Sequence, residues 1–154
     1  MGKIKKFKLQ WGDAWRIISE GYDSTIEITE DGKTILQFLV NMKPVSINLG
    51  DREDEFIQAI KKTGIKKISG YYFDYEGMLD GDEWRLDIVA DGIDVFASGH
   101  CIFPHEFERL LEYLHKEWHL PICGLARQYY HKHLDAYERQ GKRSELDEEW
   151  RMYF

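Results

Sequence analysis

The chain has 154 residues, of which 43% are hydrophobic and 14% aromatic. This composition excludes an intrinsically disordered chain, which needs low hydrophobicity and few aromatics, and the length is typical of one domain. The net charge of −7 argues against general nucleic-acid binding, because affinity for phosphate requires a basic face. We therefore expect a single domain over residues 1–154.

The sequence also indicates a compartment. Its two cysteines, Cys101 and Cys123, are too few for a disulfide framework and are typical of reduced thiols in a cytosolic protein. Neither a signal-peptide pattern nor the ~20 apolar residues of a membrane-spanning helix is found. We expect a cytoplasmic protein that has no contact with a membrane.

The first half of the chain shows strand patterns. Alternation of polar and apolar residues with period two predicts strands at 6–11, 15–19, 25–29, 34–40 and 45–49. Asp31-Gly32 lies between two of these runs, and Asp-Gly is a strong hairpin signal because it tolerates positive φ.

A helix and a further strand are expected next. Asp51 is placed as the N-cap of a helix that ends in lysines before Gly64. Strand character resumes over 66–74, where Tyr71, Phe73 and Tyr75 share one face that we assign to the core.

A second hairpin is predicted around Asp91-Gly92, joining a strand from Trp84 to a strand at 93–98. Trp84 begins an apolar strand face with Leu86 and Ile88, so we expect its side chain to be buried. An exposed Trp84 would instead indicate a binding anchor.

The last third changes to helical spacing, with helices expected from Pro104, from Pro121 and from Ser144. Strands followed by packed helices predict an α+β fold. The expected fold is an antiparallel sheet of about six to eight strands with helices packed on one face and a helical C-terminal third.

Two short motifs lie within the segment from Tyr71 to Pro104. They are Asp80-Gly81-Asp82-Glu83-Trp84 and Gly99-His100-Cys101-Ile102-Phe103-Pro104. This segment resembles a group of small uncharacterised bacterial proteins with an Asp-Gly-x-x-Trp hairpin motif and a Gly-x-x-x-aromatic-Pro helix entry. That group has Asn where this chain has Cys101. The resemblance implies a hairpin followed by a helix and no activity.

Acidic residues concentrate between residues 74 and 94, where Arg85 is the one base. Such a surface can dock a basic partner that relieves the repulsion between like charges, or the acids can simply face water and protect sheet edges. The spacing does not fit the helix-loop-helix calcium pattern. The expected partner-binding residues are Asp74, Glu76, Asp80, Asp82, Glu83, Asp87 and Asp94.

All six histidines and both cysteines lie between residues 100 and 133. His115 and His119 share one helical face, so with Cys101 and Cys123 they form a candidate zinc or catalytic group. The spacing matches no established zinc motif, and adjacent His100 and Cys101 would face opposite sides of a strand. We expect no metal and no cofactor.

These patterns favour a small acidic cytosolic binding module that docks a basic macromolecular partner, most simply a protein such as an enzyme or toxin that it restrains. The alternative is a hydrolase or metal-dependent enzyme that uses the His/Cys-rich helical third. The sequence contains no recognisable catalytic motif, so we favour the binding module.

Overall fold

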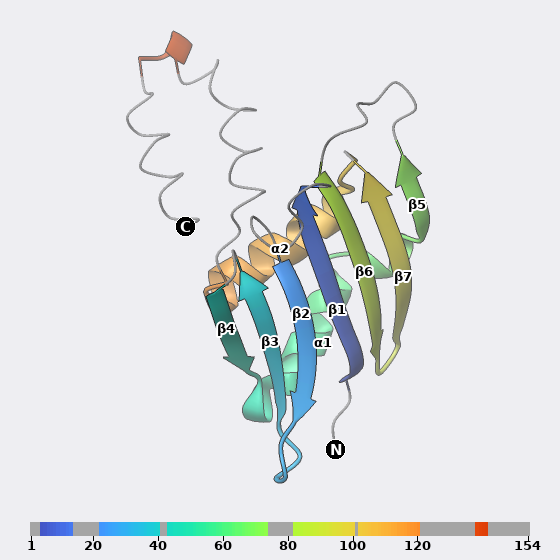
Figure 1. Cartoon of the computed structure of the whole chain (residues 1–154), viewed down its shortest axis with the longest axis vertical. Helices are drawn as coiled ribbons and strands as arrows, with labels where there is room; N and C mark the ends of the chain where they lie inside the picture. The colour runs from blue at the N-terminus through green and yellow to red at the C-terminus, as the bar shows by residue number, and fades with distance from the viewer. Residues whose placement is uncertain are drawn as a thin grey trace.

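A computed structural model of the chain describes residues 4–13, 22–40, 43–73, 82–100, 102–120 and 138–141. The described elements are seven strands, two α-helices and two 3₁₀ turns (Figure 1). In chain order they are β1 (Ile4–Asp13), β2 (Tyr22–Ile28), β3 (Thr34–Val40), β4 (Lys43–Asn48), the turn η1 (Gly50–Arg52), α1 (Glu53–Lys62), the turn η2 (Ile65–Lys67), β5 (Gly70–Phe73), β6 (Asp82–Ala90), β7 (Ile93–His100) and α2 (His105–Trp118).

The strands form one sheet in the order β4-β3-β2-β1-β6-β7-β5. The first strand is therefore central, and it pairs antiparallel with both β2 and β6. The last pair, β5 with β7, is parallel, so the expectation of a purely antiparallel sheet is wrong. The chain reverses direction from β5 to β6 and again from β6 to β7, and no direct hairpin joins β5 to β7. Two reversals leave these neighbours parallel.

Both predicted hairpins are confirmed. Between β2 and β3, Gly32 has φ of 77°, and the backbone N–H of Thr29 donates to the carbonyl of Lys33 at 2.8 Å. Between β6 and β7, Gly92 has φ of 75° at the Asp91-Gly92 turn. Positive φ is accessible to glycine because it lacks a Cβ, which explains why both turns contain it.

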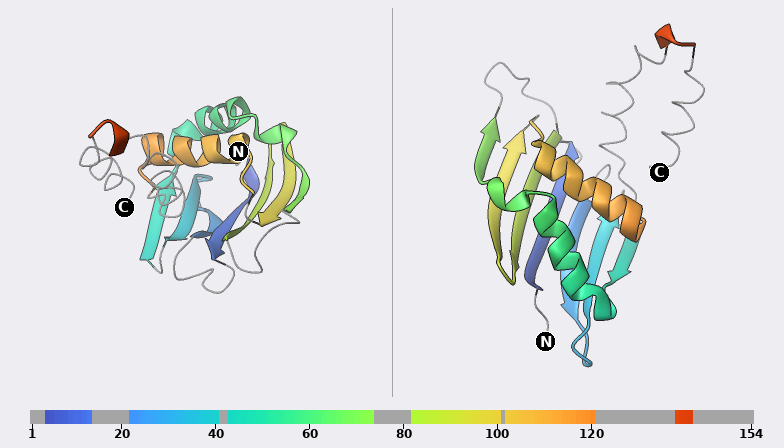
Figure 2. Two further views of the ribbon diagram at one scale, coloured as in Figure 1. Left: turned by 90° about the horizontal axis from the view of Figure 1, so that it is seen from above. Right: turned by 180° about the vertical axis from the view of Figure 1, so that it is seen from behind.

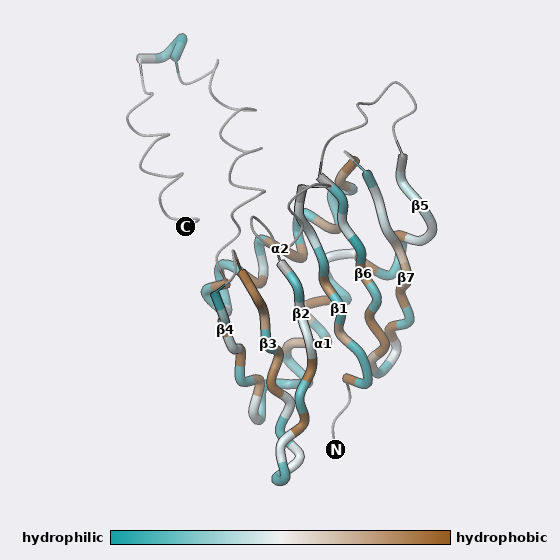
Figure 3. The backbone as a smooth tube through the Cα atoms, viewed as in Figure 1, coloured by the Kyte–Doolittle hydropathy of each residue, from teal (hydrophilic) through white to brown (hydrophobic). Residues whose placement is uncertain are grey.

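Both helices cover one face of the sheet, which curves around them (Figure 2). The other face, on which no described helix lies, is called the open face below. Along β6 and β7 hydrophilic and hydrophobic residues alternate, as Figure 3 shows. The apolar set faces the helices and forms the core with the buried stripe of α2, which consists of Phe107, Leu110, Leu111 and Leu114.

The helix starts differ in detail from the prediction. Asp51 lies in η1 and forms no capping hydrogen bond, and α1 begins at Glu53 with Arg52 in the capping position. Glu53 is itself buried, and its Oε1 accepts a hydrogen bond from the backbone N–H of Ile4 at 3.0 Å. The acidic first turn therefore secures the start of the central strand as well as complementing the helix dipole.

Trp84 is buried as predicted, with 2% of its surface exposed. Its indole packs against Phe107 of α2 with ring centroids 4.6 Å apart, and its Nε1–H donates to the carbonyl oxygen of Ile102 at 2.6 Å. The indole also lies against Gly99 on β7, where an added Cβ would collide with it. A buried Trp thus has its one polar group satisfied.

The side chains of β5 point to the opposite faces from those predicted. Tyr72 packs against Trp84 with centroids 5.9 Å apart, whereas 64% of Tyr71 is exposed. The assignment of Tyr71 to the core is therefore wrong. Phe73 lies in β5, but its side chain and all of Tyr75 fall outside the described residues.

The prediction of a helical C-terminal third is not borne out. The described helix there is α2, preceded by Pro104 and followed by His119, whose left-handed φ of 61° ends it. The helix expected from Ser144 and the strand expected at 15–19 lie outside the described residues, as does the helix expected from Pro121 except for residues 138–141, of which Glu138 and Arg139 are helical.

The two helices are joined near their ends by Arg52. Its guanidinium pairs with Glu55 through Nε at 2.7 Å and Nη2 at 3.2 Å, and with Glu117 of α2. It also stacks over the ring of Trp118 at 4.3 Å from the centroid. The indole N–H of Trp118 in turn donates to the hydroxyl of Tyr113 at 2.9 Å. One arginine therefore holds α1 and α2 together at the surface.

Candidate functional site

Charged side chains of β1, β6 and β7 lie together on the open face of the sheet. Strand β6 turns Trp84, Leu86 and Ile88 toward the helices, as predicted, and therefore turns Glu83, Arg85 and Asp87 to the open face. The register places six residues of the neighbouring strands on the same face, namely Lys6, Lys8 and Gln10 of β1 and Asp94, Phe96 and Ser98 of β7.

The predicted acidic residues are only partly described. Glu83, Asp87 and Asp94 share the open face, because they occupy alternating positions on adjacent strands. Asp74, Glu76 and Asp80 lie outside the described residues, and Asp82 begins β6 with its side chain outside them.

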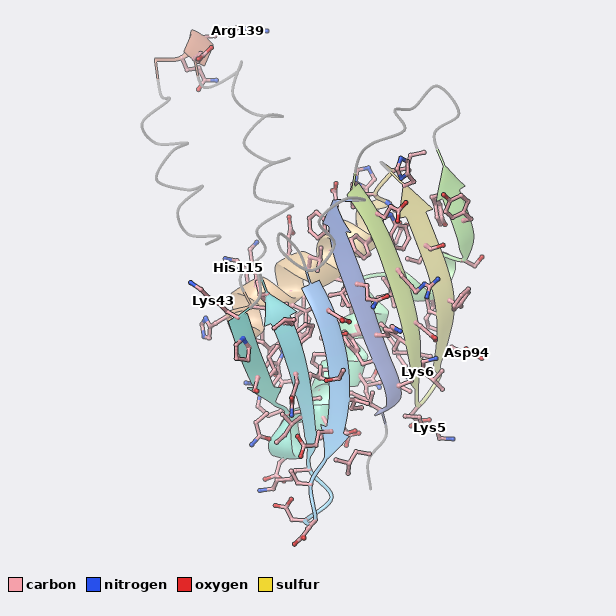
Figure 4. The ribbon with its side chains drawn as sticks, in the orientation of Figure 1. Lys5, Lys6, Lys43, Asp94, His115 and Arg139 are labelled. Carbon is pink, nitrogen blue, oxygen red and sulfur yellow. The ribbon has the colours of Figure 1, made fainter. Side chains whose placement is uncertain are left out.

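The three described carboxylates differ in their surroundings. Asp87 forms an ion pair with Lys6, and only 15% of its side chain is exposed. Oε1 of Glu83 lies 3.4 Å from Nδ1 of the buried His100 on β7. Asp94 is exposed, and within the described ranges no cation pairs with it; Figure 4 shows it near Lys6 at the same end of β6 and β7. Asp94 is therefore the carboxylate most available to another molecule.

Two large aromatic side chains also lie on this face. Phe96 is 59% exposed and Tyr71 is 64% exposed, although both belong to regular strands. Tyr71 is opposite Ser98 in the parallel pair, and Phe96 precedes Ser98 by two residues, so the two rings are diagonal neighbours. The alternation of Ile93, Val95 and Ala97 toward the core is the signal that placed Phe96 outside, and the sequence reasoning did not use it.

A hollow of about 320 Å³ lies on the open face where β1, β6, β7 and β5 meet. Its floor follows one row of cross-strand partners: Gln10 opposite Arg85, Arg85 opposite Ser98, and Ser98 opposite Tyr71. Glu83 completes the polar lining. Nothing in the sequence spacing indicated this hollow, because its four strands are brought together only by the sheet order.

The histidines of the candidate metal group are separated. Nδ1 of His115 lies 2.9 Å from the carbonyl of Leu120, and His119 is the exposed residue that ends α2. His100 lies on β7, whereas Figure 4 places His115 beside β4 at the opposite edge of the sheet. Among the described residues no group of three or more His, Cys, Asp or Glu is placed to hold a metal. Cys101 and Cys123 fall outside those residues.

Comparison with protein-family models, curated proteins and solved structures finds no match for this chain. The resemblance built on the two short motifs stays a prediction. Within the part of the chain that the structure describes, neither α-helix has the length and apolar character needed to cross a membrane.

Proposed function

We propose that the protein is a small acidic binding protein that docks a basic protein partner through its open face. The observation that carries this proposal is the pair of exposed aromatics, Phe96 and Tyr71, beside the carboxylates Asp94 and Glu83. These four residues are called the docking surface. Large aromatic side chains that are exposed to solvent on a regular strand are typical anchors of protein interfaces.

The charge of the docking surface indicates the chemistry of the partner. Asp94 lies two residues before Phe96 on the same strand face and has no ion-pair partner among the described residues. A lysine or arginine of a partner can meet this carboxylate while an apolar side chain contacts Phe96. Charge complementarity of this kind speeds encounter and selects the partner more than it adds affinity.

The strand that carries Phe96 and Asp94 is packed against the core. Phe96 and Asp94 alternate with Val95 and Ile93, which are buried against the helices. A partner therefore meets side chains whose backbone is already ordered, and little conformational entropy is lost on docking. Asp74, Glu76 and Asp80, in the segment between β5 and β6, and Asp82 at the start of β6 remain predicted members of this surface. An enzyme or toxin docked here would be restrained by occlusion of its own contact surface.

The test begins with affinity capture from native lysate and identification of the bound protein. Binding kinetics are then measured for Asp94→Lys and Phe96→Ser. We expect Asp94→Lys to slow association, and Phe96→Ser to weaken the equilibrium affinity about tenfold or more, as loss of an interface anchor does.

Matched controls separate the docking surface from general effects. Glu112→Lys makes the same charge change on an exposed position of α2, and Ile28→Ser removes an exposed apolar side chain of β2. Both are expected to bind as wild type. A captured protein that binds all four variants equally would contradict the proposal. A dimer that Phe96→Ser converts to monomer, measured by light scattering, would replace the basic partner by a second copy of the chain.

A further inference from the structure

The hollow on the open face contains Arg85, and the two acids nearest to it along β6 contact other residues. Arg85 lies between Glu83 and Asp87 on the same face of β6, two residues from each. Carboxylates at this spacing would ordinarily compete for the guanidinium. Here Asp87 is paired with Lys6 of β1, and Glu83 lies against His100 of β7. Among the residues that the structure describes, no carboxylate is within ion-pair distance of Arg85.

The remaining lining adds hydrogen-bonding groups on both sides of Arg85. Gln10 lies opposite it on β1, and its amide nitrogen donates to Asp23 at 3.1 Å, which fixes the orientation of the amide. Ser98 lies opposite Arg85 on β7 and contributes a hydroxyl. The donors that face the hollow are therefore the Arg85 guanidinium and the Ser98 hydroxyl, because the amide nitrogen of Gln10 is directed to Asp23.

We propose that this hollow binds a small molecule through its carboxylate group, with Arg85 as the anchor. The planar guanidinium offers two parallel N–H donors that match a carboxylate. The volume of about 320 Å³ is at the lower end of the range for small-molecule sites, so the ligand is small. The hollow shares Glu83 and Tyr71 with the docking surface, but the proposal does not depend on protein docking, because its anchor, Arg85, is not part of that surface.

The surrounding charge favours a single negative charge over a double one. Glu83 lines the same hollow, and Asp87 is the next acid along β6. A phosphate dianion strengthens both the attraction to Arg85 and the repulsion from Glu83, and removing it from water costs more than removing a monocarboxylate. The order of affinity is therefore benzoate above inorganic phosphate, with neutral benzamide not bound.

The experiment titrates the full chain, labelled with ¹⁵N, with benzoate, inorganic phosphate and benzamide at constant ionic strength. Benzoate is expected to produce saturable shifts of the Arg85 Nε–H and of the Gln10 side-chain amide. The variant Arg85→Gln is expected to lose about tenfold or more in benzoate affinity, the usual consequence of removing a charge-assisted hydrogen bond. The control Arg109→Gln removes an exposed arginine of α2 and is expected to bind benzoate as wild type.

Arg85 is exposed, so Arg85→Gln should keep the wild-type melting temperature, and that measurement accompanies the titration. Shifts that rise linearly without saturation would overturn the proposal. So would benzoate affinity that survives Arg85→Gln, equal binding of benzamide, or tighter binding of phosphate. Since no protein partner enters this experiment, its failure leaves the docking proposal standing, and failure of docking leaves this one standing.

Discussion

Gly99 lies under the indole of Trp84, and the absence of a side chain there allows β7 to approach the core closely. Its backbone is in a strand without positive φ, so the reason for glycine is space and not conformation. Any added Cβ must displace the indole, whose Nε1–H is hydrogen-bonded to Ile102 and whose ring packs on Phe107.

We therefore expect Gly99→Ala to lower the free energy of unfolding by about 1–3 kcal/mol, the usual cost of overpacking a core. Chemical denaturation followed by tryptophan fluorescence and circular dichroism measures it. In a Trp84→Phe background the smaller ring leaves room, so the same substitution should cost less, by about 0.5 kcal/mol or more. Equal costs in the two backgrounds would show that the indole does not limit this site.

The candidate sites could be predicted only in part, for a reason that belongs to single residues. Alternation correctly predicted that Trp84, Leu86 and Ile88 are buried together, which leaves Arg85 and Asp87 on the other face of β6. The same rule failed for Tyr71, because β5 is only four residues long and consists of aromatics and glycine. A run without polar residues does not indicate which face is buried. The hollow depends on sheet order, which no local pattern contains.

At the scale of elements, the contact between α1 and α2 depends on Arg52. Hydrogen bonding from this guanidinium, with its charge, holds the pKa of Glu55 below the ordinary value of 4.5. A carboxylate with a lowered pKa stabilises the folded state above its unfolded pKa, and this stabilisation is lost as pH falls through the folded pKa.

The difference in melting temperature between wild type and Arg52→Ala should therefore be largest near neutral pH and should narrow below about pH 4.5. It should also narrow in high salt, because the ion pairs are exposed to solvent. Thermal unfolding monitored from pH 3 to pH 7, at low and at high salt concentration, measures both effects. Arg109→Ala, which removes an exposed arginine of α2 with no ion-pair partner among the described residues, provides the control and should show no such pH dependence. If the difference in melting temperature between wild type and Arg52→Ala did not change with pH, the packing of Arg52 on Trp118, rather than its charge, would join the helices.

Most strands could be predicted at this scale, but their arrangement could not. β3 matches its predicted range, and both Asp-Gly hairpins form, because turn chemistry and alternation are local. The segment at 66–74 divides into the turn η2 and the short strand β5, since Ile65 and Ile68 are drawn into the core. The parallel pairing of β5 follows from the path of the chain and has no signature in its own residues.

At the scale of the whole molecule, β1 joins two groups of strands. On one side are β2, β3 and β4, and on the other are β6, β7 and β5. Central strands have hydrogen-bonded neighbours on both sides and bury their apolar residues fully, whereas β4 and β5 each have one neighbour. We expect native-state hydrogen exchange to be slowest in β1 and β6 and fastest in β4 and β5.

Phe7→Ala tests whether both groups depend on β1. Phe7 is buried on β1 and contacts Phe38 and Phe56, so the substitution should cost about 3–5 kcal/mol and lower protection in both groups of strands together. Val45→Ala, on the edge strand β4, should lower protection mainly near its own strand. If Phe7→Ala spared the β5-β6-β7 group, that group would be stable without β1.

The central position of β1 also affects events during synthesis. Its first partner, β2, follows within a few residues, but its second, β6, is translated only after most of the described chain: Leu9 pairs with Leu86. At roughly 5–20 residues per second, the nascent chain presents one unpaired edge of β1 for several seconds. An unpaired strand edge with Phe7, Leu9 and Trp11 can pair with other nascent chains.

Lys6 and Lys8 alternate with those residues, and their charge opposes such pairing until Asp87 has been synthesised and forms its ion pair with Lys6. We therefore expect Lys6 to oppose aggregation of the growing chain as well as to pair with Asp87 in the finished sheet.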